Sequence, residues 1–192
     1  MKNKTNIYQL TIVSMFVAIL ILQTFIPFLG YIPLGIIDIT IIQITVILAA
    51  VLFGPKIGLF IGTSWGVLSL IRAYTRLNPL TAVFLNPLVS VVPRLLVGWL
   101  SGLLYIWLKE KLSDRLSLAI TAFVGTLLNT ILVLGSIYIF SSEAYAAALN
   151  VSESALLGVL GGIIATNGVI EALASLIILP LIAIPVLRAL KR

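Results

Sequence analysis

Long apolar stretches, separated by short polar or proline-containing breaks, occupy nearly the whole chain. They predict six helices, at about residues 7–26, 38–53, 57–72, 88–108, 116–140 and 155–187. A helix needs about 20 apolar residues to cross the hydrocarbon core of a bilayer, and most of these stretches approach or exceed that length. The pattern therefore predicts an all-α integral membrane protein, a six-transmembrane-helix bundle that forms a single domain over residues 1–192.

Polar residues, glycine and proline mark the ends of the predicted helices. The second helix is expected to begin near Asp38, because a carboxylate is favourable at a helix N-terminus. Residues 28–37, which hold two glycines and Pro33, are expected to form the preceding loop. Pro180 and Pro185 are expected to loosen the last helix, because proline removes a backbone donor.

One polar stretch, residues 72–94, interrupts the apolar pattern in the middle of the chain. It carries three of the twelve basic residues and two Asn-Pro-Leu repeats, which begin at Asn78 and Asn86. Proline disfavours helix at the residue before it, so both repeats should break regular structure. Irregular backbone at a membrane is tolerated where protein covers it or where it lines a wet cavity. We therefore expect this stretch to form the rim and lid of a binding pocket.

The basic residues are distributed unevenly between the two ends of the predicted helices. With six spans both termini lie on the same side of the membrane, and cytoplasmic loops are normally enriched in lysine and arginine. Nine of the twelve basic residues fall on the side of the termini: Lys2, Lys4, Lys56, Lys109, Lys111, Arg115, Arg188, Lys191 and Arg192. Both termini are therefore predicted to be cytoplasmic, and the lid is predicted to face outward.

Composition agrees with a membrane protein and argues against several functions. The chain is 61% hydrophobic and 9% charged, with a mean hydropathy of +1.23, whereas soluble domains carry about 25% charged residues. Cysteine and histidine are absent from the sequence, which removes thiol chemistry and most metal sites. The sequence has no phosphate-binding loop, no paired-carboxylate motif and no interleaving of aromatic and basic residues. We therefore expect that the protein is not an enzyme and that it binds no nucleic acid, metal or cofactor.

Small residues recur at every fourth position in two of the predicted helices. In the third helix they are Gly54, Gly58, Gly62 and Gly66. Glycine rows let helices approach closely in lipid, so this face is expected to pack inside the bundle. Ser14 and Ala18 form a similar pair in the first helix. That pair either packs internally or docks another protein, and composition alone leaves both open.

Polar residues inside the predicted spans are the most informative positions, because each costs free energy in hydrocarbon. They are Gln43, Arg94, Asn129, Asn167 and Glu171. On translocon scales a central arginine costs roughly 2.5–3.5 kcal/mol. The fourth and sixth helices both enter the membrane from outside, so Arg94, Asn167 and Glu171 are expected to meet in the outer half.

Two arrangements fit these polar residues. In the first, Arg94 and Glu171 form an ion pair, and the amides only join helices. In the second, they line a pocket with one cation, one anion and several amides, which suits a small, polar, anionic ligand. Arg94 would then bind a carboxylate through two parallel hydrogen bonds. Aromatic side chains would cover the apolar part of the ligand or anchor the protein at the membrane surface: Trp65, Tyr74 and Phe84.

Three blocks of sequence carry a resemblance to a known family. They are NPLTAVFLNPLVSVVPRLLVG (Asn78–Gly98), TLLN (Thr126–Asn129) and NGVIE (Asn167–Glu171). Together with the length, the six predicted helices and the basic C-terminus, they make the whole chain similar to the substrate-binding S components of energy-coupling factor (ECF) vitamin transporters. Within that family the blocks most resemble the pantothenate-specific members from Gram-positive bacteria.

The resemblance implies a function and a set of partners. S components bind a vitamin from outside the cell and dock onto a shared module of one T subunit and two ATPases, which would supply any ATPase activity. The location implied is the plasma membrane of a bacterium, in contact with lipid. The docking motif of the family is Ala-xxx-Ala in the first helix. Ser14 and Ala18 stand at these positions, so the resemblance favours partner docking for this pair.

For pantothenate as substrate, Arg94 is expected to hold the carboxylate. Hydroxyl and amide groups of the ligand are expected to meet Asn129, Asn167 and Glu171, and the lid around Asn86 to close over it. Two further residues complete the expected contacts: Gln43 and Tyr74.

Other functions remain open at this point. The chain resembles S components for pyridoxine, hydroxymethylpyrimidine or cobalamin in parts of the same pattern. An autonomous secondary carrier of a small organic anion is a second class, with Glu171 as a proton site. A membrane enzyme acting on lipids ranks last, because the sequence offers no recognisable nucleophile or acid–base pair.

Overall fold

The computed structural model describes residues 2–34, 37–76 and 78–190. Its helices are α1 (Lys2–Phe25), α2 (Ile42–Phe53), α3 (Pro55–Thr75), α4 (Pro87–Ser90), α5 (Val92–Lys109), α6 (Asp114–Leu149), α7 (Glu153–Ile163) and α8 (Val169–Leu190). Between them lie strands β1 (Tyr31–Leu34) and β2 (Ile37–Thr40), a 3₁₀ turn η1 (Ala82–Leu85) and a π-helical turn η2 (Ile164–Gly168). Each of the six predicted ranges overlaps one or more of these helices, and the strands are an addition to the prediction.

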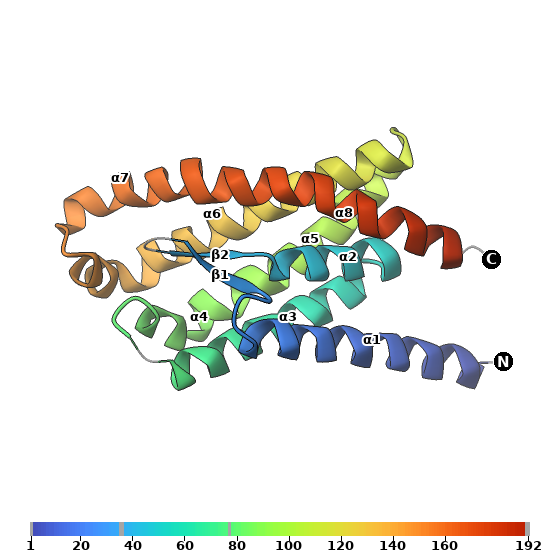
Figure 1. Cartoon of the computed structure of the whole chain (residues 1–192), viewed down its shortest axis with the longest axis horizontal. Coiled ribbons are helices and arrows are strands. Elements are labelled where there is room, and N and C mark those ends of the chain that lie inside the picture. The colour runs from blue at the N-terminus through green and yellow to red at the C-terminus, as the bar shows by residue number, and fades with distance from the viewer. Residues whose placement is uncertain (1, 35–36, 77, 191–192) are drawn as a thin grey trace.

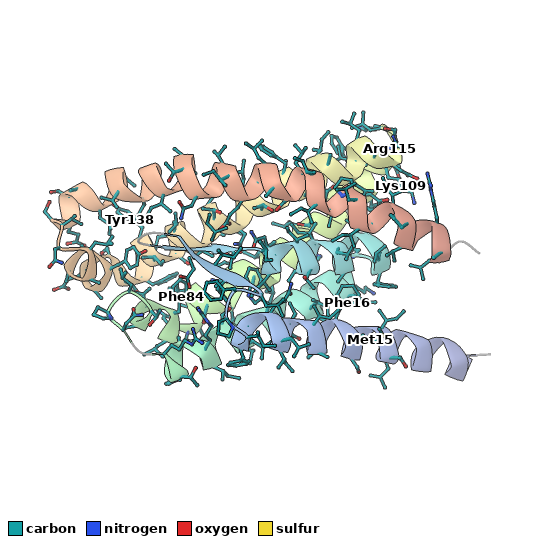
Figure 2. The ribbon with its side chains drawn as sticks, in the orientation of Figure 1. Met15, Phe16, Phe84, Lys109, Arg115 and Tyr138 are labelled. Carbon is teal, nitrogen blue, oxygen red and sulfur yellow. The ribbon has the colours of Figure 1, made fainter. Side chains whose placement is uncertain are left out.

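Four helical segments of the described chain are long and apolar enough to cross a membrane, judged by length and composition: Pro55–Thr75, Pro87–Lys109, Asp114–Leu149 and Glu153–Leu190. The apolar helices Leu10–Phe25 and Ile42–Phe53 are shorter. The helices run along the long axis of the molecule, and α1 begins at the same end at which α8 finishes (Figure 1). Lys109 and Arg115 lie at this end too, whereas Phe84 lies in the opposite half (Figure 2).

Strands β1 and β2 form an antiparallel hairpin that corrects the prediction of a loop followed by a helix from Asp38. Tyr31 pairs with Thr40 and Pro33 with Asp38, and α2 begins only at Ile42. The segment is rich in β-branched residues, which favour extended backbone. The carboxylate of Asp38 binds Arg72 of α3 at 3.3 Å instead of a helix N-terminus. The hairpin thereby lies against the C-terminal part of α3.

The last long helical segment contains a π turn as well as its two prolines. Pro180 and Pro185 lie within α8, which is continuous around them. The π-helical turn η2 instead separates α7 from α8 and ends three residues before Glu171. Such turns occur often at functional sites, because they change the direction of the side chains that follow. In α6 a non-helical residue, Ser141, marks a kink close to the predicted helix end at residue 140.

The glycine face of α3 packs against α5 inside the bundle, as predicted. A Cβ atom added at Gly58 would collide with the carbonyl oxygen of Gly98, and one at Gly62 with the carbonyl oxygen of Arg94. A Cβ at Gly66 would lie 2.6 Å from the Cα of Val91. The two backbones therefore touch along three successive turns, and this contact fixes the position of Arg94 relative to α3. Gly54 differs from the other three, since it occupies the turn before α3 with a φ of 90°.

Within the described residues, buried apolar side chains form three clusters. One joins α1, α2 and α3 and includes Leu20, Ile42, Val46, Ala49, Ile61 and Trp65. A second joins α2, α5, α6 and α8 and includes Ile47, Val97, Leu118 and Leu179. The third joins η1, α4, α6 and α7 and includes Val83, Val89, Val133, Leu134, Ile137 and Leu156.

Candidate ligand-binding site

A cavity of about 220 Å³ lies between the hairpin, α3, α5, α6 and α8. Its wall holds three arginines, two carboxylates and three asparagines: Arg72, Arg76, Arg94, Asp38, Glu171, Asn78, Asn129 and Asn167. Aromatic and aliphatic side chains complete it, among them Tyr31, Trp65, Leu80, Phe84, Val133, Leu134, Ile137 and Ile163. Such a mixture, mostly apolar with a few convergent polar groups, is typical of a small-molecule site.

Arg94 is the cation of the cavity interior and is 6% exposed. It is the third residue of α5, where Pro93 starts the helix and the glycine face of α3 fixes the backbone. Its Nη1 donates to the carbonyl oxygen of Val89 at 2.6 Å. Its Nε is buried, and no hydrogen-bond partner for it lies within the described part of the chain. A guanidinium carries five N–H donors in a planar fork, so Arg94 has donors available for a ligand.

Two aromatic rings flank the guanidinium of Arg94. Its Cζ lies 5.3 Å from the ring centroid of Trp65 and 5.3 Å from that of Phe84. Both distances fall within the range of cation–π attraction, which is strongest where water is excluded. Trp65 comes from α3 and Phe84 from η1, so α3 and the lid stretch each place a ring beside the guanidinium of Arg94.

Asn129 and Asn167 bring amide groups to the same cavity, from α6 and η2. Asn129 is buried, and its Oδ1 has no partner among the residues that the structure describes. A buried amide oxygen without a partner is costly unless water or a ligand satisfies it. Thr130 lies beside Asn129 on the cavity wall and donates to the carbonyl oxygen of Thr126.

Glu171 lines the cavity, but both of its carboxylate oxygens are bound to protein. Oε1 accepts hydrogen bonds from the backbone N–H of Thr40 at 2.7 Å and from the Thr40 hydroxyl at 3.3 Å. Oε2 accepts from Nε2 of Gln43 at 3.1 Å. No ion pair joins Glu171 to Arg94, two residues that the structure describes in full. The arrangement in which these two neutralise each other is therefore not the one observed.

A further cluster on the cavity wall is not predicted by the sequence pattern. The guanidinium of Arg72 lies 3.8 Å from the ring centroid of Tyr31 and bonds Asp38. The Tyr31 hydroxyl accepts from Trp65 Nε1 at 3.4 Å and lies 3.3 Å from the hydroxyl of Ser69. The charges of Arg72 and Asp38 were visible in the sequence, but only the hairpin brings them together.

Three residues expected to contact the ligand are placed elsewhere. Gln43 is 0% exposed and stands behind Glu171, outside the cavity lining. Asn86 caps α4, where its Oδ1 accepts from the N–H of Leu88 at 3.0 Å. Tyr74 is 62% exposed on the outer surface of α3. Of the lid stretch, Asn78, Leu80, Thr81 and Phe84 reach the cavity wall instead.

Ser14 and Ala18 are both exposed on α1, which lies at the edge of the bundle (Figure 1). The neighbouring Met15 and Ile19 are exposed as well. The buried side of α1 is a different one, which carries Leu20 and Thr24. Internal packing of the small pair, one of the two alternatives, is therefore not what the fold shows.

Among the described residues, no group of three or more carboxylate, imidazole or thiol side chains comes together. The donors that line the cavity include guanidinium, amide and hydroxyl groups, which suit an organic ligand with a carboxylate.

A cavity with a buried arginine and an unpartnered amide oxygen, enclosed by apolar helices, defines a small-molecule-binding protein of the membrane. Residues 8–183 match the family model described as the ECF transporter, substrate-specific component. The chain belongs to this family, whose members are substrate-binding components of transporters and not enzymes.

One relative is similar over part of the chain. A protein described as pantothenate transporter PanT, from Leuconostoc mesenteroides subsp. mesenteroides, is 42% identical over 77 residues. The matched stretch covers 38% of this chain and 37% of that relative.

Proposed function

We propose that this chain is the pantothenate-binding S component of an ECF importer, and that it binds the vitamin in the cavity around Arg94. The observation that carries the proposal is a buried guanidinium that lines the cavity and forms no ion pair with any described acidic residue. A cation in such a place is costly unless an anion joins it. The description of the partial relative as a pantothenate transporter supports the choice of vitamin.

The groups of pantothenate correspond to the donors and acceptors of the wall. Its carboxylate would bind the fork of Arg94 in a planar, bidentate contact. Its amide and two hydroxyls would bind Asn129 and Asn167, whose amides both donate and accept. Its gem-dimethyl group would lie against the aliphatic wall of Val133 and Ile137. Glu171 is not assigned a ligand contact, because its oxygens already accept three hydrogen bonds.

The membrane arrangement follows the same proposal. The chain would lie in a bacterial plasma membrane with six spans and both termini cytoplasmic, so that the hairpin and lid face outward. The basic residues Lys109 and Arg115 at the end where α1 begins support this orientation, because they would lie inside (Figure 2). The exposed pair Ser14 and Ala18 would dock the T subunit. Two partner ATPases would supply the energy.

The first experiment is a titration of the purified chain followed by tryptophan fluorescence. Pantothenate, thiamine, pyridoxine and an analogue of pantothenate without the carboxylate are compared. Tight binding of pantothenate alone, lost with the carboxylate, is the expected result. Tight binding of another vitamin would disprove pantothenate as the substrate but would still agree with an S-component function. Uptake by liposomes that hold the chain alone, without ATP, would instead favour an autonomous carrier.

A further inference from the structure

Glu171 connects three elements that meet at the edge of the cavity. It extends from α8, Thr40 is the last residue of β2, and Gln43 is the second residue of α2. Its Oε1 holds the N–H of Thr40 and its Oε2 holds the amide of Gln43. Gln43 also donates to the carbonyl oxygen of Thr40 at 2.5 Å. One carboxylate thus fixes the point at which the hairpin joins α2.

We propose that Glu171 is a positioning residue, which holds the β1–β2 hairpin in place over the cavity and does not itself contact the ligand. This inference rests on the proposed function, since it assigns the hairpin a role in retaining the vitamin. It replaces the direct ligand contact that the position of Glu171 in the sequence predicts.

The hairpin links the position of Thr40 to that of Tyr31 on the cavity wall. Tyr31 is the residue directly opposite Thr40 in the antiparallel register. The hydroxyl of Tyr31 accepts a hydrogen bond from the indole N–H of Trp65. Trp65 in turn lies against the guanidinium of Arg94. A displacement of Thr40 would therefore move Tyr31, and Trp65 would lose its partner.

A second attachment lies further out along the same strand. Asp38 of β2 is held by Arg72, which also covers the ring of Tyr31. The hairpin is thus attached to α3 through Asp38 and Tyr31, and to α8 through Thr40. The attachment to α8 is the buried one, so it depends least on solvent and salt.

The chemistry of Glu171 fits a positioning role better than simple helix packing. A buried carboxylate and a fully buried amide add little to stability compared with apolar side chains of similar size. Both carboxylate oxygens accept, and both facing groups are donors. A glutamine at this position keeps one acceptor, so its NH₂ would face either the N–H of Thr40 or the Nε2 of Gln43, and Gln43 could accept from it only by reversing its amide and giving up its bond to the carbonyl oxygen of Thr40. E171Q should therefore keep the size of the side chain and lose one side of the attachment.

The test follows Trp65 in protein without ligand. Trp65 is one of three tryptophans, so W99F/W107F leaves it as the sole reporter. Quenching by acrylamide is measured for this background and for E171Q, Q43L and N167A built on it. Gln43 lies outside the cavity lining, so Q43L removes no ligand contact. Asn167 lines the cavity one turn before Glu171, and no hydrogen bond joins it to the described hairpin residues, so N167A is the matched control.

E171Q and Q43L are expected to raise the quenching constant of Trp65, while N167A leaves it unchanged. In stopped-flow experiments both are also expected to speed release of pantothenate, by about tenfold for one lost charged hydrogen bond. Normal Trp65 quenching in E171Q together with weaker binding would make Glu171 a ligand contact and overturn the proposal. Wild-type behaviour of Q43L in both measurements would overturn it as well. The quenching arm needs no ligand, so a chain that fails to bind pantothenate would refute the proposed function separately.

Discussion

The guanidinium carbon of Arg94 lies 5.3 Å from the ring centroid of Trp65, and a second ring, Phe84, lies at the same distance. Together with the carbonyl oxygen of Val89, these contacts hold the cation in one position before any ligand arrives. Preorganisation of this kind strengthens binding, because less side-chain freedom is lost when the ligand docks. A flexible surface cation would lack this preorganisation.

Arg94→Ala should abolish tight binding of pantothenate. Removal of one partner of a buried, hydrogen-bonded charge pair costs about 2–5 kcal/mol, which corresponds to at least a 30-fold rise in Kd. The Kd of R94K should lie between those of the wild type and R94A, because an ammonium keeps the charge without the planar fork. Isothermal titration measures both. The control is the analogue without a carboxylate, which should bind the wild type and R94A with similar weak affinity; wild-type affinity in R94A would disprove the assignment.

Gly62→Ala should disturb the same site from the opposite helix. The new Cβ would collide with the carbonyl oxygen of Arg94, so α3 and α5 must separate. Overpacking of this kind costs about 1–3 kcal/mol, and it should lower the melting temperature and weaken binding together. Gly135→Ala in α6 is the control, because its Cβ meets nothing within 4 Å. Equal melting temperatures for the two variants would contradict the close contact.

The polar positions of the site were accessible from the sequence, because Arg94, Asn129 and Asn167 interrupt apolar helical stretches where polar groups need a reason. The glycine face of α3 was accessible for a similar reason, since its period matches one side of a helix. The role of Asn86 was also within reach. An asparagine followed by proline is a signature of a helix start, and Asn86 caps α4 in this way.

The hairpin and its attachments were not accessible in the same way. Strand pairing between Tyr31 and Thr40 depends on contacts with α3 and α8, which lie far away in the sequence. The local pattern around Asp38 fits a helix start as well as a strand, and the through-space contact with Arg72 decides between them. Glu171 likewise takes its partners from a segment more than a hundred residues away, so no spacing rule could have named them.

The ion pair between Asp38 and Arg72 should make a modest contribution to retention of the ligand. Asp38 is partly exposed, so the pair is expected to supply only about 0.2–1 kcal/mol, and less at high salt. D38N and R72Q should each speed release of pantothenate by a few-fold at low ionic strength. A double-mutant cycle isolates the pair, since the double variant should add little to either single change. Strict additivity would show that the two side chains act independently.

Variants of the exposed pair on α1 should separate binding from transport. Ser14→Leu and Ala18→Leu should leave the fold and the affinity for pantothenate unchanged, because neither side chain packs inside the bundle. Helix–helix contacts in lipid depend on small residues that let backbones approach, so two leucines should prevent close docking of a T subunit. ATP-driven uptake in proteoliposomes that hold the whole importer should then be lost.

The control for that prediction is Ile131→Trp, an equally bulky change at an exposed position of α6. It should leave both binding and uptake intact, because α6 offers no comparable small face at this point. If S14L/A18L transports at the wild-type rate, the pair is not a docking surface. If it loses binding as well as uptake, α1 supports the cavity directly. Only loss of uptake with retained binding fits a division of labour, in which the cavity recognises the vitamin and α1 recognises the module.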